Sequence, residues 1–292
     1  MTPLLLILAS LVAINPVPAK APAPVQATLV ADRSAAVPGQ TLRVGVRYDL
    51  EPGWHIYWVN PGDAGLATRV QLMLPQGLTA GPLHWPLPRQ FVDTSGDVRI
   101  VSFGYTHQVL LWSDVQVPQD LKPGAQVTFK VHTDWLMCKE KCIPGQVDLK
   151  LSLPVADAAQ SAHAELFKTW QERVPLDGPS LPSQNRWAAA VQNTPPQRET
   201  PGRVHAEITW PAAGGTQTQP RTDFEFLPMA DPSLLLSNTK VTPGPHHVVI
   251  EFTYQGVDPT KALPASLPVV IAYRDARHIR HGVALVLPLA SR

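Results

Sequence analysis

Apolar and polar residues alternate along most of residues 27–155. Three stretches, at residues 42–50, 127–135 and 147–153, place an apolar or aromatic side chain at nearly every second position. Because successive side chains of a strand point to opposite faces, this period is typical of strands that bury one face. Five further strand candidates lie between Pro- and Gly-containing turns: residues 27–34, 54–59, 69–74, 98–103 and 108–117. The pattern predicts roughly seven or eight short strands in an antiparallel sandwich.

A helical pattern replaces the alternation after this region. Apolar residues recur at helical spacing from Ala162 to Trp170, and Pro175 begins a Pro- and Gly-containing stretch. Such a stretch ends a helix and favours an extended connection. We therefore predict a short helix and linker over residues 156–186.

The remaining residues, 187–292, return to strand patterns. Residues 248–254 alternate, and residues 267–274 and 282–290 are almost continuously apolar, as is typical of buried strands. This half has no cysteine and no recognisable chemical motif. The strand pattern of this half predicts a second β-sandwich domain. We therefore expect a mainly β chain with two antiparallel sandwich domains joined by a short helix and linker.

The first residues have the pattern of an export signal. The apolar stretch at residues 4–14 is too short to span a bilayer but has the length of a signal-peptide core, and Val17-Pro18-Ala19 supplies small residues for cleavage. No Lys or Arg precedes the stretch, which departs from the usual pattern, and an uncleaved anchor or a misassigned start would explain that. We expect residues 1–19 to be a signal peptide and the exported protein to be soluble.

Composition and motifs exclude several classes of function. The chain has 24 Lys and Arg against 23 Asp and Glu, a net charge of +1, with no basic stripe of the kind that binds nucleic acid. It also lacks a G-x-S-x-G motif, an H-E-x-x-H motif and a phosphate-binding loop. A nucleic-acid-binding protein or a hydrolase is therefore not expected.

The only two cysteines, Cys138 and Cys142, lie within five consecutive positions. If the flanking strands pair as a hairpin, the two side chains face each other across its tip. If the segment forms one helical turn, the i,i+4 spacing also brings them together. Both geometries permit a disulfide, and an exported protein meets an oxidising compartment.

Three roles for the pair are open. A structural disulfide that closes so short a loop would add only about 2 kcal/mol through chain entropy, which a domain with this much apolar sequence does not need. Short loops are more typical of pairs that exchange thiol and disulfide, and Lys139 and Lys141 would stabilise a thiolate while Glu140 would oppose it.

The third role is a metal site. Two thiolates suit Cu(I), but they need a further ligand. Met137, His132, His84 and His107 could supply it, but no His lies at short fixed spacing from the pair. We expect no cofactor and no resident metal.

The stretch DWLMCKEKCIPG, residues 134–145, followed by an alternating strand, resembles the N-terminal periplasmic domain of DsbD-type thiol:disulfide interchange proteins. The likeness is greatest to the branch that includes the ScsB copper-tolerance proteins. Residues 53–70, GWHIYWVNPGDAGLATRV, and residues 97–115, DVRIVSFGYTHQVLLWSDV, agree in the same order. Together the three stretches cover most of residues 27–155.

The resemblance implies an immunoglobulin-like sandwich with a redox-active pair, Cys138 and Cys142, in which Cys142 engages the acceptor. It also implies an aromatic cap loop, expected here within residues 91–105. Two sandwich domains often precede the membrane segment in the ScsB-like branch, which suits residues 187–292. The membrane and thioredoxin domains of full-length family members have no counterpart in this sequence.

We therefore expect a periplasmic component of a protein-disulfide reductase system. A membrane-embedded thiol reductase would donate electrons, and thioredoxin-like exported proteins would accept them. The alternative is a non-catalytic periplasmic module that binds copper or a partner and has a structural disulfide.

Overall fold

The computed structural model describes most of the chain from residue 23 to residue 289. The segments it does not describe within these limits are 96–97, 183–185, 198–199, 212–220, 230 and 259. The predicted signal peptide, residues 1–19, lies outside the described residues. No helix in the described part is both long and apolar enough to cross a membrane.

The first half forms two sheets that pack face to face, here called the first sandwich. One sheet has the order β1 (Val25–Ala31), β2 (Thr41–Leu50), β8 (Gln108–Gln116) and β5 (Thr79–Ala80). The other has the order β10 (Cys142–Pro154), β9 (Gln126–Cys138), β3 (His55–Gly62), β7 (Val98–Thr106) and β6 (Arg89–Ser95), and β4 (Arg69–Met73) also pairs with β9. The named strands of these two sheets pair antiparallel.

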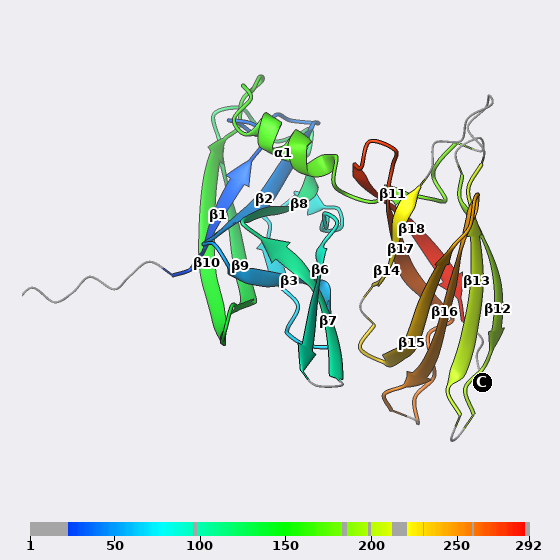
Figure 1. Cartoon of the computed structure of the whole chain (residues 1–292). Helices are drawn as coiled ribbons and strands as arrows, with labels where there is room; N and C mark the ends of the chain where they lie inside the picture. Colours follow the sequence, from blue (N-terminus) through cyan, green and yellow to red (C-terminus); the bar gives the residue numbers. More distant parts are fainter. Residues whose placement is uncertain are drawn as a thin grey trace, which may run out of the picture.

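The core of the first sandwich comes from the alternation seen in the sequence. In β9, Val127, Phe129 and Val131 are buried, whereas Lys130 between them is exposed. The helix α1 (Ala164–Gln171) closes one end of this core, because its buried Phe167 packs edge-on against Trp112. The predicted helix therefore exists, and it packs on the first sandwich (Figure 1).

The second half forms another two-sheet arrangement, here called the second sandwich. One sheet has the order β11 (Leu176–Asp177), β18 (Arg280–Pro288), β17 (Ser266–Arg274) and β14 (Thr222–Pro228). The other has the order β12 (Ala188–Thr194), β13 (Gly202–Thr209), β16 (His247–Gly256) and β15 (Leu234–Pro243). The pairing is antiparallel except between β11 and β18, which are parallel. The prediction of a mainly β chain with immunoglobulin-like sandwiches is confirmed.

The position of strand β17 between two cores explains why its sequence does not alternate between apolar and polar residues. Val269 and Ile271 point into the core of the second sandwich, whereas Val270 and Ala272 join the core cluster of the first. A strand buried on both faces reads as a continuous apolar run. The two sandwiches therefore share apolar packing, and a groove of about 280 Å³ between them is lined by residues that include Trp58, Trp85 and Met229.

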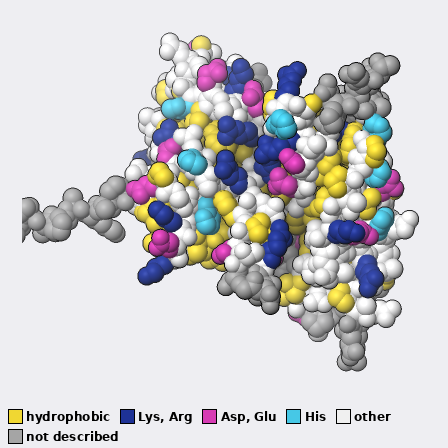
Figure 2. All heavy atoms as spheres, in the orientation of Figure 1, with side chains coloured by type: hydrophobic (Ala, Val, Ile, Leu, Met, Phe, Trp, Pro, Cys, Tyr) yellow, Lys and Arg dark blue, Asp and Glu magenta, His cyan; other side chains and the backbone are white. Residues whose placement is uncertain are grey.

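The surface is mixed in charge. On the face shown in Figure 2, basic and acidic side chains are interspersed with apolar ones over both sandwiches. This agrees with the near-neutral composition of the chain.

Candidate functional site

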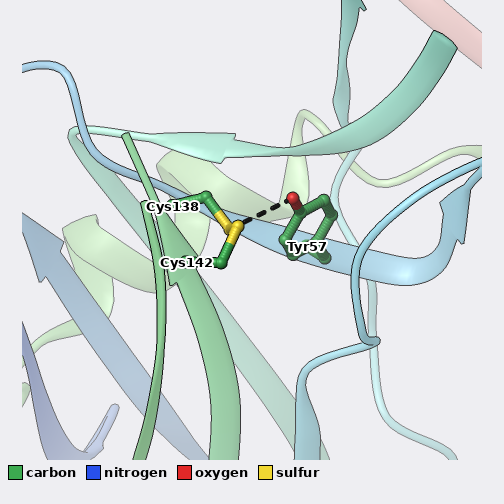
Figure 3. The surroundings of a disulfide bond; sticks show 3 residues. All are labelled: Tyr57, Cys138 and Cys142. Atoms are coloured by element: carbon green, nitrogen blue, oxygen red, sulfur yellow. Dashed lines mark hydrogen bonds between the residues drawn. A yellow bond between two sulfur atoms is a disulfide. The ribbon is translucent and has the colours of Figure 1, made fainter. Parts of the chain in front are cut away.

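The two cysteines lie at the tip of the β9–β10 hairpin. The strands pair over their whole length, and Cys142 stands directly opposite Cys138. The two residues form a disulfide with their Cα atoms 4.1 Å apart (Figure 3). Of the two geometries that the spacing permits, the chain has the hairpin.

The disulfide lies on the outer face of the six-stranded sheet. Met137 and Ile56, opposite each other, point into the core, so Cys138 and its opposite residue His55 point away from it. Tyr57, two positions after His55, lies on the same outer face. The disulfide is therefore separated from the sandwich core by the sheet itself.

The two cysteines differ in burial. Cys138 is only 3% exposed, whereas Cys142 is exposed. Cys142 is therefore the more accessible of the two residues.

The hydroxyl of Tyr57 donates a hydrogen bond to Cys138 Sγ at 3.2 Å, as Figure 3 shows. Burial raises the pKa of Tyr57 above its usual value, so the hydroxyl keeps its proton near neutral pH. Gly65, with a φ of +104°, lies directly against the ring, because a Cβ there would be 2.3 Å from Tyr57 Cε1. This close approach fixes where the hydroxyl points.

His55 lies between two aromatic rings. It stacks on Phe91 with ring centroids 4.7 Å apart and meets Tyr57 edge-on at 5.2 Å. Burial lowers the pKa of His55 below its ordinary value of 6.5, so the imidazole is neutral at pH 7. The surroundings of Cys138 are therefore aromatic and uncharged on this side.

Phe91 lies in the edge strand β6 and covers the His55 ring. The cap was expected within residues 91–105, and this segment contributes to strands β6 and β7. Phe91 is the first residue of that range and the third residue of β6. His55 and Tyr57 were not singled out from the sequence. Their spacing of two places them on one face of a strand, but nothing local shows that this face meets the cysteines.

The residues that flank the cysteines divide between core and surface. Trp135 and Met137 are buried in the core cluster of the first sandwich, whereas Ile143 is 43% exposed. Lys139 and Lys141 in the turn are exposed. Ile143 therefore gives the tip of the hairpin an exposed apolar surface beside Cys142.

The histidines considered as metal ligands have other partners. His132 pairs with Asp148 at 2.8 Å and His84 with Asp114 at 2.9 Å. Within the described residues, no group of three or more His, Cys, Asp or Glu side chains is placed to hold a metal ion.

Residues 26–154 match the family described as "Thiol:disulfide interchange protein DsbD, N-terminal". The predicted family resemblance is confirmed. The match spans the first sandwich and includes both cysteines, so this DsbD-type sandwich has a role related to thiol–disulfide interchange. A family with this activity also implies contact with other thiol-redox proteins.

The fold of the whole described chain has a counterpart among solved structures. The crystal structure of the N-terminal periplasmic domain of ScsB from Proteus mirabilis is similar over 91% of this chain and 93% of that chain, with a TM-score of 0.58 and 15% identity. At that identity the likeness shows a shared fold, which extends over both sandwiches. Spo0M, a sporulation control protein from Bacillus subtilis, has a TM-score of 0.20 at 12% identity and 91% coverage of each chain, too low to indicate a common fold. No curated protein sequence matches the chain.

Proposed function

We propose that the chain is a periplasmic relay of reducing equivalents that works through Cys138 and Cys142. The observation that carries the proposal is the asymmetric disulfide: an exposed cysteine is bonded to a buried one, and the sulfur of the buried one accepts a hydrogen bond from Tyr57. The family match of the surrounding sandwich supports the same activity.

The first half-reaction reduces the pair. A donor thiolate attacks Cys142 Sγ, the bond between the two sulfurs breaks, and Cys138 leaves as a thiolate that accepts the Tyr57 hydrogen bond. The second thiol of the donor loses its proton and attacks the donor sulfur of the mixed disulfide, which releases Cys142. The donor ends as a disulfide, and the pair has gained two electrons and two protons.

The second half-reaction passes these electrons on. The Cys142 thiolate attacks a disulfide of the acceptor, and one acceptor sulfur leaves as a thiolate. The Cys138 thiol then loses its proton and attacks Cys142 Sγ, which restores the disulfide. The two acceptor sulfurs take up two protons in place of those that Cys142 and Cys138 lost, and the acceptor leaves as a dithiol. The short loop keeps Cys138 beside the mixed disulfide throughout.

The proposed donor is a membrane-embedded thiol reductase, and the proposed acceptors are thioredoxin-like exported proteins. Both kinds of partner present an exposed reactive sulfur, which fits an exposed Cys142 at the end of a hairpin. The turn next to it has charged residues and the exposed Ile143, which provide polar and apolar contacts for a transient complex.

Trapping of mixed disulfides tests the proposal. The variant Cys138→Ser keeps the exposed Cys142 and lacks the sulfur that resolves a complex, so it is expected to accumulate disulfide-linked partners from the cell envelope. The matched variant Cys142→Ser keeps only the buried Cys138 and is expected to capture far less. Mass spectrometry of the complexes identifies the partners. If neither variant captures a thiol-redox protein, the relay is contradicted.

A further inference from the structure

Both strands that surround the disulfide with aromatic side chains also reach the second sandwich. Strand β3, which carries His55 and Tyr57, extends to Asn60, whose Nδ2 donates to the carbonyl of Pro228 in β14 at 2.9 Å. Strand β6, which carries Phe91, begins at Arg89. The preceding residue, Pro88, accepts a hydrogen bond from the second sandwich through its carbonyl. Figure 1 shows the β6–β7 hairpin on the side of the first sandwich that faces the second.

The carbonyl before β6 belongs to Pro88 and accepts a hydrogen bond of 2.6 Å from Arg280 Nη1 of β18. The guanidinium is itself fixed, because its Nε and Nη2 bond both carboxylate oxygens of Glu225 at 3.0 and 2.9 Å. The Arg280 side chain is 18% exposed and that of Glu225 is 25% exposed. A bidentate, partly buried pair of this kind holds its donor in one direction.

The segment before Pro88 is held as closely. The Tyr105 hydroxyl donates to the carbonyl of Pro86 at 2.7 Å, and the Leu87 amide donates to the carbonyl of Arg173 at 2.8 Å. Leu87 also packs against Gly282 of β18, where a Cβ would lie 2.6 Å from Leu87 Cδ2. Proline fixes the backbone at two of the three positions, so the base of β6 is a stiff segment.

We infer that Arg280 is a positioning residue, through which the second sandwich holds Phe91 over His55 and so keeps Cys138 covered. Phe91 lies three positions after Pro88, and the stack on His55 places Phe91 beside the residue opposite Cys138. This inference rests on the proposed function. In that function, the second sandwich sets how accessible Cys138 is.

Arg280→Met tests the inference, because the substitution keeps the apolar stem and removes the donors. Loss of the charge-assisted hydrogen bond is expected to open the β6–β7 hairpin at least about tenfold more often. In the full chain with Cys142→Ser, where Cys138 is the remaining cysteine, the Cys138 thiol would then be alkylated at least about tenfold faster by iodoacetamide, measured by mass spectrometry. The control is Arg274→Met, which removes an exposed arginine of the same sandwich that pairs with Asp223.

A double variant separates positioning from general loosening. Phe91→Ala removes the ring that Arg280 is inferred to position, so it should also speed the alkylation of Cys138, and adding Arg280→Met should increase the rate no further. An unchanged rate in Arg280→Met, or effects of the two substitutions that multiply, would overturn the inference. Glu225→Gln gives the same test with a smaller expected increase, should Arg280→Met not fold.

The alkylation needs no protein partner, so this test is independent of the trapping experiment. If the alkylation rate responds to Arg280 but the trapping variants capture no partner, the relay is contradicted and the positioning role stands. If partners are captured but the alkylation rate does not respond to Arg280, the positioning role is contradicted and the relay stands.

Discussion

At the scale of single residues, the asymmetry between the two sulfurs decides the order of the proposed steps. A thiolate on Cys138 forms in a buried site, and burial without a hydrogen bond disfavours the charged form. Tyr57 supplies that bond at 3.2 Å, with a hydroxyl that remains protonated at neutral pH. The hydroxyl therefore makes Cys138 the better leaving group when Cys142 is attacked.

Replacing Tyr57 with Phe removes the hydroxyl and keeps the ring. We expect the pKa of the Cys138 thiol to rise and the reduction of the disulfide by a dithiol to slow about tenfold, as the loss of one hydrogen bond to a charged group predicts. Stopped-flow reduction followed by alkylation measures the rate. Tyr48→Phe is the matched control, because its hydroxyl bonds to Thr133 in the core. A wild-type rate in Tyr57→Phe would remove this hydroxyl from the mechanism.

His55 makes stability depend on pH. Its pKa is lowered by burial, so the unfolded chain binds a proton at a higher pH than the folded chain does. The stability that the neutral imidazole permits is present above its ordinary pKa of 6.5 and is lost as the pH falls below it through the folded pKa. We expect the urea midpoint to fall between pH 7 and pH 5, and to fall less in His55→Gln. Equal falls in the two proteins would contradict the assignment.

At the scale of elements, the β9–β10 hairpin holds the cysteines together with or without their bond. The two strands pair from Pro154 and Gln126 to the cysteines, and the buried face of β9 anchors the hairpin in the core. The disulfide closes only a five-residue loop, so its removal changes the chain entropy little. The scaffold is therefore suited to both redox states.

Reduction of the pair is accordingly expected to leave the first sandwich folded. The free energy of unfolding should drop by about 2 kcal/mol or less, as loop closure predicts. Urea titrations of the oxidised and reduced full chain, followed by tryptophan fluorescence, measure the difference. A chain that unfolds on reduction would show that the bond is structural.

Much of this architecture was predictable from the alternation of apolar and polar residues, and the site was predictable only in part. The period of two in β2, β9 and β10 shows which side chains are buried. The same period puts Cys138 on the polar face of β9, with Lys130 and His132. There it meets Tyr57, which bonds to its sulfur, and His55, which stands opposite it and carries the stacked Phe91. Other strands supply these residues, and no local pattern reports such contacts.

Two strands of the first sandwich had no signal of their own. β5 has two residues, and β6 is an edge strand whose Val92 is 51% exposed, so neither shows a clear apolar period. Because β6 carries Phe91, the sequence did not single out the residue that stacks on His55.

At the scale of the whole molecule, β17 joins the two sandwiches. Its alternate side chains pack in two different cores. Hydrogen bonds of Asn60 and Arg280 also link β3 and the residue before β6 to the second sandwich. This shared packing predicts that the sandwiches unfold together. The sequence showed that β17 is apolar on both faces, but it did not show what covers the second face.

Val270→Asp should uncouple the sandwiches. Val270 is 3% exposed on the face of β17 that meets the first sandwich, and an unpaired carboxylate there costs several kcal/mol. We expect calorimetry to show two separate transitions in place of one. Val286→Asp, on an exposed position of β18, is the control and should keep a single transition. A single transition in both variants would contradict the coupling.

The reduction potential of the Cys138–Cys142 pair tests the central claim most directly. The full chain is equilibrated with thiol–disulfide buffers of known potential, and the fraction of free thiol is read by alkylation. An exchanging pair with one exposed sulfur should have a potential above about −300 mV, within reach of cellular dithiols. A value well below about −300 mV would mark a permanent bond and contradict the relay.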